Sequence, residues 1–177
     1  MRKLVVSSLV SVDGVHGDPG SWASAYFDAE AVETSLAKLQ ASDAMLMGRN
    51  TYQYFAAAWS EPTGPYDQRL HDIQKYVFSS TLTSADWNNS TVVSGDAVAA
   101  VSELKDQDGG DLMIYGYGRL SQTLLAHDLV DELNFWINPV VLGSGAPLFR
   151  PGGRRALRLT SSEVRSNGVV CLGYSPA

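Results

Sequence analysis

The sequence has few of the residues that secreted and membrane proteins depend on. Its 177 residues include a single cysteine, Cys171, so no disulfide can form within the chain and a cysteine-based zinc site has too few ligands. No apolar run approaches the roughly 20 residues of a membrane span. The apolar stretch after Met1-Arg2-Lys3 is too short for a signal peptide with a cleavage site. We therefore expect a cytoplasmic protein without a membrane partner.

Positive charge is also scarce. The chain has 13 Lys and Arg residues against 19 Asp and Glu residues, which gives a formal net charge of -6 and a pI of about 4.9. A duplex nucleic-acid binder normally presents a basic face, so a nucleic-acid partner is disfavoured. His71 and His127 have no paired ligands at metal spacing, and we expect no metal site. An acidic protein can still bind an anionic cofactor where backbone N–H groups and an arginine surround it.

What the chain does contain is an alternation of short apolar runs and amphipathic stretches, with 45% hydrophobic residues overall. No linker or internal repeat divides it, so we expect one domain over residues 1–177. The apolar runs predict strands, and the stretches with helical periodicity predict helices. The expected strands are 3–10, 44–47, 76–78, 91–93, 112–115 and 133–142. The expected helices are 29–41, one that begins after Gly48, one that Asp96 caps and that runs to about Leu104, and 118–126.

Two further segments complete the pattern. Residues 60–74 hold two prolines and a glycine within a short span, which predicts a surface excursion. Residues 156–165 and 168–174 are joined by an Asn-Gly pair, the strongest hairpin signal in the chain. Together these elements imply an α/β fold, a mainly parallel sheet with helices on both faces and an antiparallel C-terminal hairpin. The apolar 133–142 strand beside the hairpin needs covering, so we also expect a homodimer.

One strand-to-helix junction has the residues of a phosphate site. In sheets of this kind, ligands bind beyond the carboxyl ends of the strands. Gly48 ends an apolar strand and lets backbone approach a ligand closely, and the following helix offers free N–H groups. Arg49 can form a forked contact with a phosphate, and Thr51 can donate its hydroxyl. The alternative is a plain strand–turn–helix junction with a capping threonine.

A second junction, at residues 115–120, has the sequence Tyr-Gly-Tyr-Gly-Arg-Leu. Its two glycines predict a tight turn whose N–H groups could cradle a pyrophosphate, although Ser121 takes the place of the third glycine of a Rossmann fingerprint. Between the two junctions, residues 78–81 read Phe-Ser-Ser-Thr and supply three hydroxyls at a strand end. The alternatives are an ordinary tight turn at the second junction and an ordinary polar loop at 78–81.

Four motifs in this order resemble those of a known family. Met-Gly-Arg-Asn-Thr-Tyr at 47–52 is similar to the cofactor motif of dihydrofolate reductases, and so is the glycine turn at 116–118. Ser-Ser-Leu-Val-Ser-Val-Asp-Gly at 7–14 resembles the first strand and loop of the riboflavin-pathway reductase domains, and residues 131–149 resemble their C-terminal signature. The chain thus resembles the C-terminal pyrimidine reductase domain of the riboflavin biosynthesis bifunctional proteins. The resemblance implies a dihydrofolate-reductase-like fold with three α/β/α layers, and NADPH as the hydride donor.

The resemblance also implies roles for individual residues. Gly48, Arg49 and Thr51 would contact the phosphates on the adenosine side of the cofactor, and Ser79 and Ser80 would lie near its 2′-phosphate or adenine. The residues that would wrap the pyrophosphate are Gly116, Tyr117, Gly118, Arg119 and Leu120. Tyr117 stands where the family usually has a second glycine.

The substrate side is predicted from the loop after the first strand and from the first helix. Asp13 lies in the loop that should cover the nicotinamide and is our candidate acid, with an Asp-Gly turn as the alternative. Trp22 could stack on a heteroaromatic substrate with Tyr26 as a second wall, or either ring could serve packing. Trp59 and Trp136 show no pattern beyond packing or interface roles.

The carboxylate of dihydrofolate reductases falls near Val32, with Glu33 adjacent. The apolar Val32 argues against folate, although a shift of one residue would restore a carboxylate at this position.

These expectations describe an NADPH-dependent reductase of a heterocyclic small molecule, most like 5-amino-6-(5-phosphoribosylamino)uracil reductase. The protein would mainly orient the substrate against the nicotinamide and exclude water. A dihydrofolate, pterin or xenobiotic reductase on the same scaffold is one alternative. The other is an NADPH-binding dimer without turnover.

Overall fold

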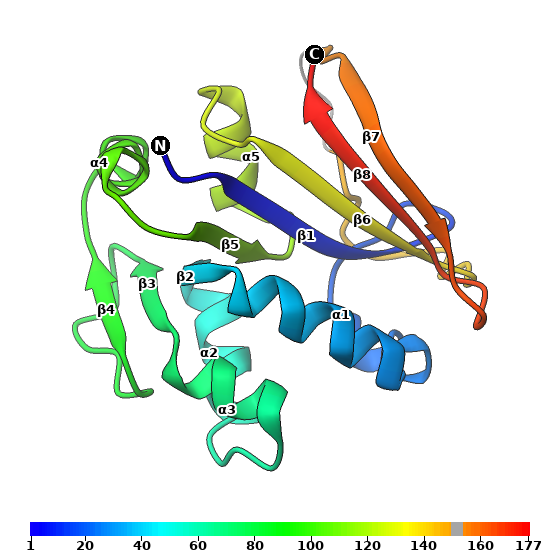
Figure 1. Cartoon of the computed structure of the whole chain (residues 1–177), viewed down its shortest axis with the longest axis horizontal. Coiled ribbons are helices and arrows are strands. Elements are labelled where there is room, and N and C mark those ends of the chain that lie inside the picture. The colour runs from blue at the N-terminus through cyan, green and yellow to red at the C-terminus, as the bar shows by residue number, and fades with distance from the viewer. Residues whose placement is uncertain (150–153) are drawn as a thin grey trace.

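A single sheet organises the computed structural model, which describes residues 1–149 and 154–177. The sheet has eight strands in the order β4-β3-β2-β5-β1-β6-β8-β7 (Figure 1). The strands that run parallel are β1 (Leu4–Ser11), β2 (Ser42–Gly48), β3 (Gln74–Phe78), β4 (Ser90–Val93), β5 (Asp111–Tyr115) and β6 (Glu132–Asn138). The antiparallel strands β8 (Val170–Pro176) and β7 (Leu157–Val164) extend the sheet beyond β6. The predicted mainly parallel sheet with a C-terminal hairpin is therefore confirmed.

Helices cover both faces of this sheet, because the chain reverses its direction of travel across it. From β1 the chain moves through β2 and β3 to β4, and it then returns to β5 and crosses to β6. Right-handed crossovers place the helices of the outward and return paths on opposite faces. Figure 1 shows the two layers on either side of the sheet. One layer holds α1 (Ala29–Gln40), α2 (Arg49–Ala58) and α3 (Pro65–Asp72), and the other holds α4 (Ala97–Asp106) and α5 (Arg119–Ala126).

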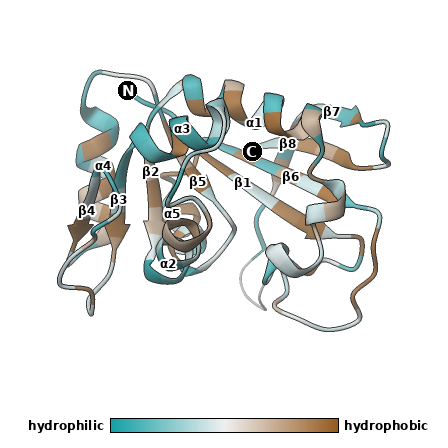
Figure 2. Cartoon of the chain, turned by 90° about the horizontal axis from the view of Figure 1, so that it is seen from below, coloured by the Kyte–Doolittle hydropathy of each residue, from teal (hydrophilic) through white to brown (hydrophobic). Residues whose placement is uncertain are grey.

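The apolar runs of the central strands supply a core on each face. In β2, Ala44 and Leu46 pack into the cluster that contains α4 and α5, whereas Met45 and Met47 pack into the cluster that contains α1, α2 and α3. A strand buried on both faces needs an unbroken apolar sequence, which is what residues 44–47 have. The helices bury only one stripe, and α1 accordingly alternates between hydrophobic and hydrophilic turns (Figure 2).

The helices begin in two different ways. Asp28 caps α1 by accepting a hydrogen bond from the Ala31 amide at 3.0 Å. Asp96 caps α4 by accepting one from the Val98 amide at 2.8 Å, which confirms the predicted cap. By contrast, the N-cap residues of α2 and α5 are Gly48 and Gly118, so neither helix has a side-chain cap. The first N–H groups of these two helices are left for another partner.

The segment 60–74, expected as a surface excursion, contains a helix that the sequence pattern did not predict. This segment contains α3, which buries Tyr66 and Leu70 on its inner side. Pro65 is the first residue of the helix, where its missing N–H costs nothing and its fixed φ angle favours the helical turn. Proline here marks the start of a helix and does not break one.

The last parallel strand, β6, ends at Asn138 and is therefore shorter than the predicted 133–142. Pro139 follows, and proline has no N–H to donate to a neighbouring strand. The chain then turns through Gly143 and Gly145, both at positive φ. The C-terminal hairpin forms as predicted, and Gly168 takes a φ of 86° in its turn. Within the described residues, no helix is long and apolar enough to cross a membrane.

Candidate functional site

A cavity of about 660 Å³ opens where two neighbouring strands release their helices to opposite faces of the sheet. Strands β2 and β5 are paired, but α2 leaves β2 on one face and α5 leaves β5 on the other. The two helix N-termini therefore diverge at the carboxyl edge of the sheet, where ligands bind in open α/β folds. The predicted cofactor residues that line this first cavity are Gly48, Arg49, Thr51, Ser79, Ser80, Gly116, Gly118, Arg119 and Leu120.

The glycines of the first cavity keep its wall open. A Cβ built on Gly48, Gly116 or Gly118 would meet no heavy atom within 4 Å. Gly116 also has a φ of 91°, which disfavours any other residue. A ligand can thus approach the backbone at the start of both helices, where unpaired N–H groups and the helix dipoles favour an anion.

The charge of the first cavity is positive. Its described lining includes the two arginines Arg49 and Arg119 and no carboxylate. The Arg49 guanidinium donates a hydrogen bond to the Thr81 hydroxyl at 3.0 Å, so it points toward the loop that follows β3. The Ser79 hydroxyl oxygen accepts hydrogen bonds from the amides of Thr81 and Leu82 and holds that loop in shape. These contacts gather an arginine and several hydroxyls at one end of the cavity.

Tyr117 differs from the other predicted cofactor residues, because its ring points into the core. The residue is 3% exposed and packs edge-on against Phe135 and Phe149, with ring centroids 5.9 and 5.3 Å away. Only its backbone is therefore left for a ligand in the glycine turn. Tyr117 stands in place of the family's second glycine, but its side chain takes no space in the first cavity because it points away from that cavity.

A second cavity of about 650 Å³ adjoins the first. The residues that line both cavities are Asn50, Thr51, Tyr115, Gly116 and Gly118. The rest of the second cavity includes residues 7–9 of β1, the loop at residues 16–20, the small residues Ala23, Ser24 and Ser35, and aromatic residues. The aromatic residues are Phe27, Tyr54, Phe55, Trp59, Tyr66, Tyr117 and Trp136. One elongated ligand, or two ligands end to end, can therefore occupy the two cavities together.

The aromatic wall is not the one predicted from the sequence. Trp22 and Tyr26 line neither cavity. The Trp22 indole donates a hydrogen bond to the Gly17 carbonyl at 3.0 Å, so this side chain stabilises the loop at residues 16–20. Tyr26 packs beside the small cluster around Trp136. The rings that do line the cavity include Trp59 and Trp136, for which the sequence indicated only packing.

Asp13 ties two loops together, and its geometry argues against a role as proton donor. Its carboxylate accepts hydrogen bonds from the Ser11 hydroxyl at 2.6 Å and from the amides of Leu142 and Gly143 at 3.1 and 2.7 Å. These donors stabilise the charged form and lower the pKa of Asp13 to about 2. The residue also lines neither cavity. A carboxyl group that is ionised at neutral pH has no proton to give.

The first helix brings no carboxylate into the second cavity. Val32 packs against the core under α1 and Glu33 is exposed, whereas Ser35 is the α1 residue that lines the cavity. Among the described residues, Asp18 is the one carboxylate in the lining, and it belongs to the 16–20 loop. No group of three or more His, Cys, Asp or Glu side chains in the described parts of the chain could hold a metal ion.

A three-layer α/β/α sandwich with paired cavities at the carboxyl edge of its sheet defines a protein of the dihydrofolate-reductase-like class. The chain belongs to the RibD C-terminal domain family, whose model matches residues 2–171.

Three similar proteins support this assignment. The uncharacterised Bacillus subtilis (strain 168) protein YyaP is 29% identical over 180 residues, which cover 98% of this chain and 94% of YyaP. A Shewanella sp. PV-4 protein assigned to riboflavin biosynthesis has a TM-score of 0.80 at 24% identity, covering 99% of both chains. A Thermotoga maritima deaminase/5-amino-6-(5-phosphoribosylamino)uracil reductase has a TM-score of 0.66 at 12% identity, covering 99% of this chain and 57% of the other. At these identities the two solved structures establish the shared fold.

We predict that Asp13→Asn loosens the two loops and removes no proton donor. Asparagine keeps one acceptor oxygen and replaces the other with an NH2 donor, so it can no longer accept from both the Leu142 and the Gly143 N–H groups. Hydrogen exchange at these two amides should speed up. The native contact itself is present above the ordinary pKa of 3.8 and is lost as the pH falls through about 2. A pH–rate profile that loses a limb near neutrality in the variant would contradict this structural role.

Proposed function

We propose that this protein is an NADPH-dependent reductase of a heterocyclic small molecule, most like 5-amino-6-(5-phosphoribosylamino)uracil reductase. The observation that carries the proposal is the pair of adjoining cavities, one positive and rich in glycine, the other walled by aromatic rings. NADPH supplies a hydride, and the chain must bind its phosphates in one place and a planar acceptor in another. A single free cysteine also fits a reducing cytoplasm, where we place the protein.

The residues of the first cavity fit the phosphates of the cofactor. Gly48 and Gly118 leave the N-termini of α2 and α5 open to a pyrophosphate, and Gly116 lets it approach the backbone. Arg49, with the hydroxyls of Ser80 and Thr81 beside it, is suited to a ribose 2′-phosphate. Arg119, Leu120 and the backbone of Tyr117 would complete the turn around the pyrophosphate.

The residues of the second cavity fit the nicotinamide and a flat acceptor. Trp59, Tyr54 and Trp136 supply faces for stacking, and Asn50 and Thr51 supply polar groups where the two cavities meet. Gly17 and Gly20 let the covering loop approach closely, since a Cβ on Gly20 would overlap the Tyr54 hydroxyl. This loop would exclude water from the reacting carbon.

Two other functions are compatible with the same fold. A dihydrofolate, pterin or xenobiotic reductase would use the same cofactor site, but a folate enzyme needs a carboxylate on the first helix, and α1 presents Ser35 and no carboxylate to the second cavity. An NADPH-binding dimer without turnover would need only the first cavity. The aromatic second cavity favours an enzyme over a binding protein.

We also propose a homodimer, on a different edge from the one that the sequence indicated. Strand β6 lies inside the sheet between β1 and β8, so it needs no cover. Among the described residues, β7 forms the edge of the sheet on this side, and it is exposed along most of its length, with Leu159 at 53% and Val164 at 76% exposure. A second copy could pair with this edge and protect it.

The enzyme is tested by oxidation of NADPH in the presence of a ribosylaminopyrimidine or of dihydrofolate, followed by nicotinamide absorbance. We expect turnover of the pyrimidine, and we expect Gly118→Ala to weaken NADPH binding about tenfold because its methyl group enters the cavity. Gly64→Ala is the matched control, since Gly64 also precedes a helix with open space around it but lines neither cavity. NADPH binding without turnover of any heterocycle would favour the binding protein.

Arg49→Ala should weaken NADPH about tenfold or more and NADH only slightly, because a charge-assisted contact to the 2′-phosphate is lost. Titration calorimetry measures both dissociation constants. Arg158→Ala removes an exposed arginine on β7 and should change neither affinity. Equal losses for the two cofactors would contradict the 2′-phosphate role of Arg49.

Light scattering at micromolar concentration should give the mass of a dimer. Val164→Lys places a charge on the free edge of β7 and should shift the protein toward the monomer. A monomeric mass for the unmodified protein contradicts the dimer.

A further inference from the structure

The charges of the molecule are divided unevenly between the two cavities. The described lining of the second cavity consists of aromatic rings, small neutral polar groups, His16 and Asp18, and it contains no lysine or arginine. The two arginines, Arg49 and Arg119, both belong to the first cavity. In the proposed function both arginines bind phosphates of the cofactor, so neither is available to pair with a phosphate of the substrate.

The floor of the second cavity also stays neutral. Burial raises the pKa of Tyr66 to about 12, and burial beside Tyr66 raises the pKa of Tyr115 well above its ordinary value. Both phenols therefore keep their protons at physiological pH. The Tyr115 hydroxyl is buried close to that of Tyr66, and its ring stacks on Phe55 with centroids 5.9 Å apart. This floor offers neutral hydrogen-bonding groups, and it disfavours an added charge because the charge would be desolvated there.

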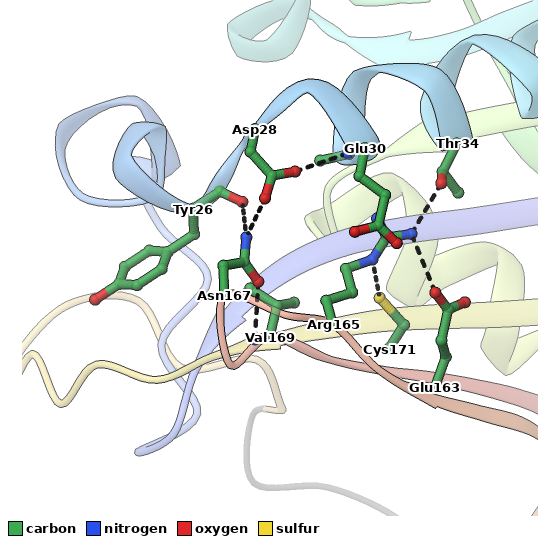
Figure 3. A network of polar contacts seen from close by, with 10 residues as sticks. Tyr26, Asp28, Glu30, Thr34, Glu163, Arg165, Asn167, Val169 and Cys171 are labelled. Atoms are coloured by element: carbon green, nitrogen blue, oxygen red, sulfur yellow. Dashed lines mark hydrogen bonds and ion pairs between the residues drawn. The ribbon is translucent and has the colours of Figure 1, made fainter.

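Another cation, Arg165, lies behind the aromatic wall. The Arg165 guanidinium sits 4.6 Å from the Trp136 ring, on a side chain that is 1% exposed. Figure 3 shows it in the turn of the C-terminal hairpin, directed at α1. It donates hydrogen bonds to the Thr34 hydroxyl at 2.9 Å and to the Cys171 sulfur at 3.2 Å.

Two carboxylates complete the surroundings of Arg165. Glu30 lies 3.5 Å and Glu163 3.8 Å from its guanidinium nitrogens. Because these groups already balance its charge and Trp136 separates it from the cavity, Arg165 is not available to a ligand. Its cation instead packs over the Trp136 ring and holds that ring in position.

We propose that the second cavity takes an uncharged, planar heterocycle that carries no phosphate group, so the substrate is the unphosphorylated counterpart of a phosphoribosylamino-pyrimidine. The inference rests on the proposed function and restricts its substrate class. A phosphate dianion moved from water into this cavity would lose its hydration without gaining a lysine or arginine partner in the described lining, whereas a flat neutral ring gains stacking and hydrogen bonds.

The test compares 5-amino-6-ribosylaminouracil with its 5′-phosphate, two probes that differ only in the phosphate. The protein is first saturated with NADP⁺, and binding of each probe is followed by quenching of tryptophan fluorescence, since Trp59 and Trp136 line the cavity. We expect the neutral probe to bind about tenfold or more tighter. The measurement uses the full chain and so includes Arg150, which lies outside the described residues.

A gain-of-charge variant gives a second, independent comparison. Ser24 is exposed and lines the second cavity, so Ser24→Lys places a cation at its rim. The ratio of the two affinities should shift about tenfold toward the phosphorylated probe. Ser102→Lys on the exposed side of α4 adds the same charge outside both cavities and away from β7, and it should leave the ratio unchanged.

Each outcome bears on one proposal. Equal or tighter binding of the phosphorylated probe by the unmodified protein overturns the inference and leaves the reductase standing. Failure of the NADP⁺-loaded protein to bind either probe also overturns it, because the inference names this class of ring. Failure to bind NADPH or NADP⁺ overturns the proposed function instead.

Discussion

The reversal of the chain across the sheet at β5 is the constraint on which the rest of the structure depends. Because crossovers are right-handed, the outward and return paths deposit their helices on opposite faces. Strands β2 and β5 end side by side, yet α2 and α5 separate from them in opposite directions. The first cavity lies between these two helix N-termini. Its backbone N–H donors are the unpaired groups that every helix N-terminus has, so they need no additional structure.

The division of charge between the two cavities follows from this arrangement. Both arginines that line a cavity sit at the first turn of α2 or α5, so positive charge gathers where those helices begin. The second cavity lies farther along, between β1, α1 and the covering loop, and its walls come from the apolar side of those elements. An anion and a flat neutral ring thus have separate places within one continuous cleft.

Contacts between distant segments hold the cover of the second cavity. Asp13 joins the loop after β1 to the amides of Leu142 and Gly143, and the Val12 amide donates to the Val140 carbonyl at 2.9 Å. On the other side, the hairpin turn reaches α1 through Arg165, and the Asn167 side chain donates to the Asp28 carboxylate at 2.8 Å. These contacts hold the loop and the Trp136 ring in position through residues that lie outside the cavity. The residues that would touch a ligand are therefore not needed to hold the loop and the ring.

The sequence by itself determined the parts of this protein that depend on local chemistry. The apolar run at 44–47, the Asp96 cap, the Asn-Gly hairpin turn and the glycines at both helix starts each have their cause within a few residues, and the structure has them where expected. Only the tertiary structure decided what faces the second cavity. Periodicity tells which side of an element is buried, but it does not tell whether that side meets core or cleft. The sequence pattern therefore indicated only packing or interface roles for Trp59 and Trp136, and it predicted Trp22 as a wall of the substrate site. It also predicted Asp13 as an acid, because the hydrogen-bond partners of Asp13 lie some 130 residues away in the sequence.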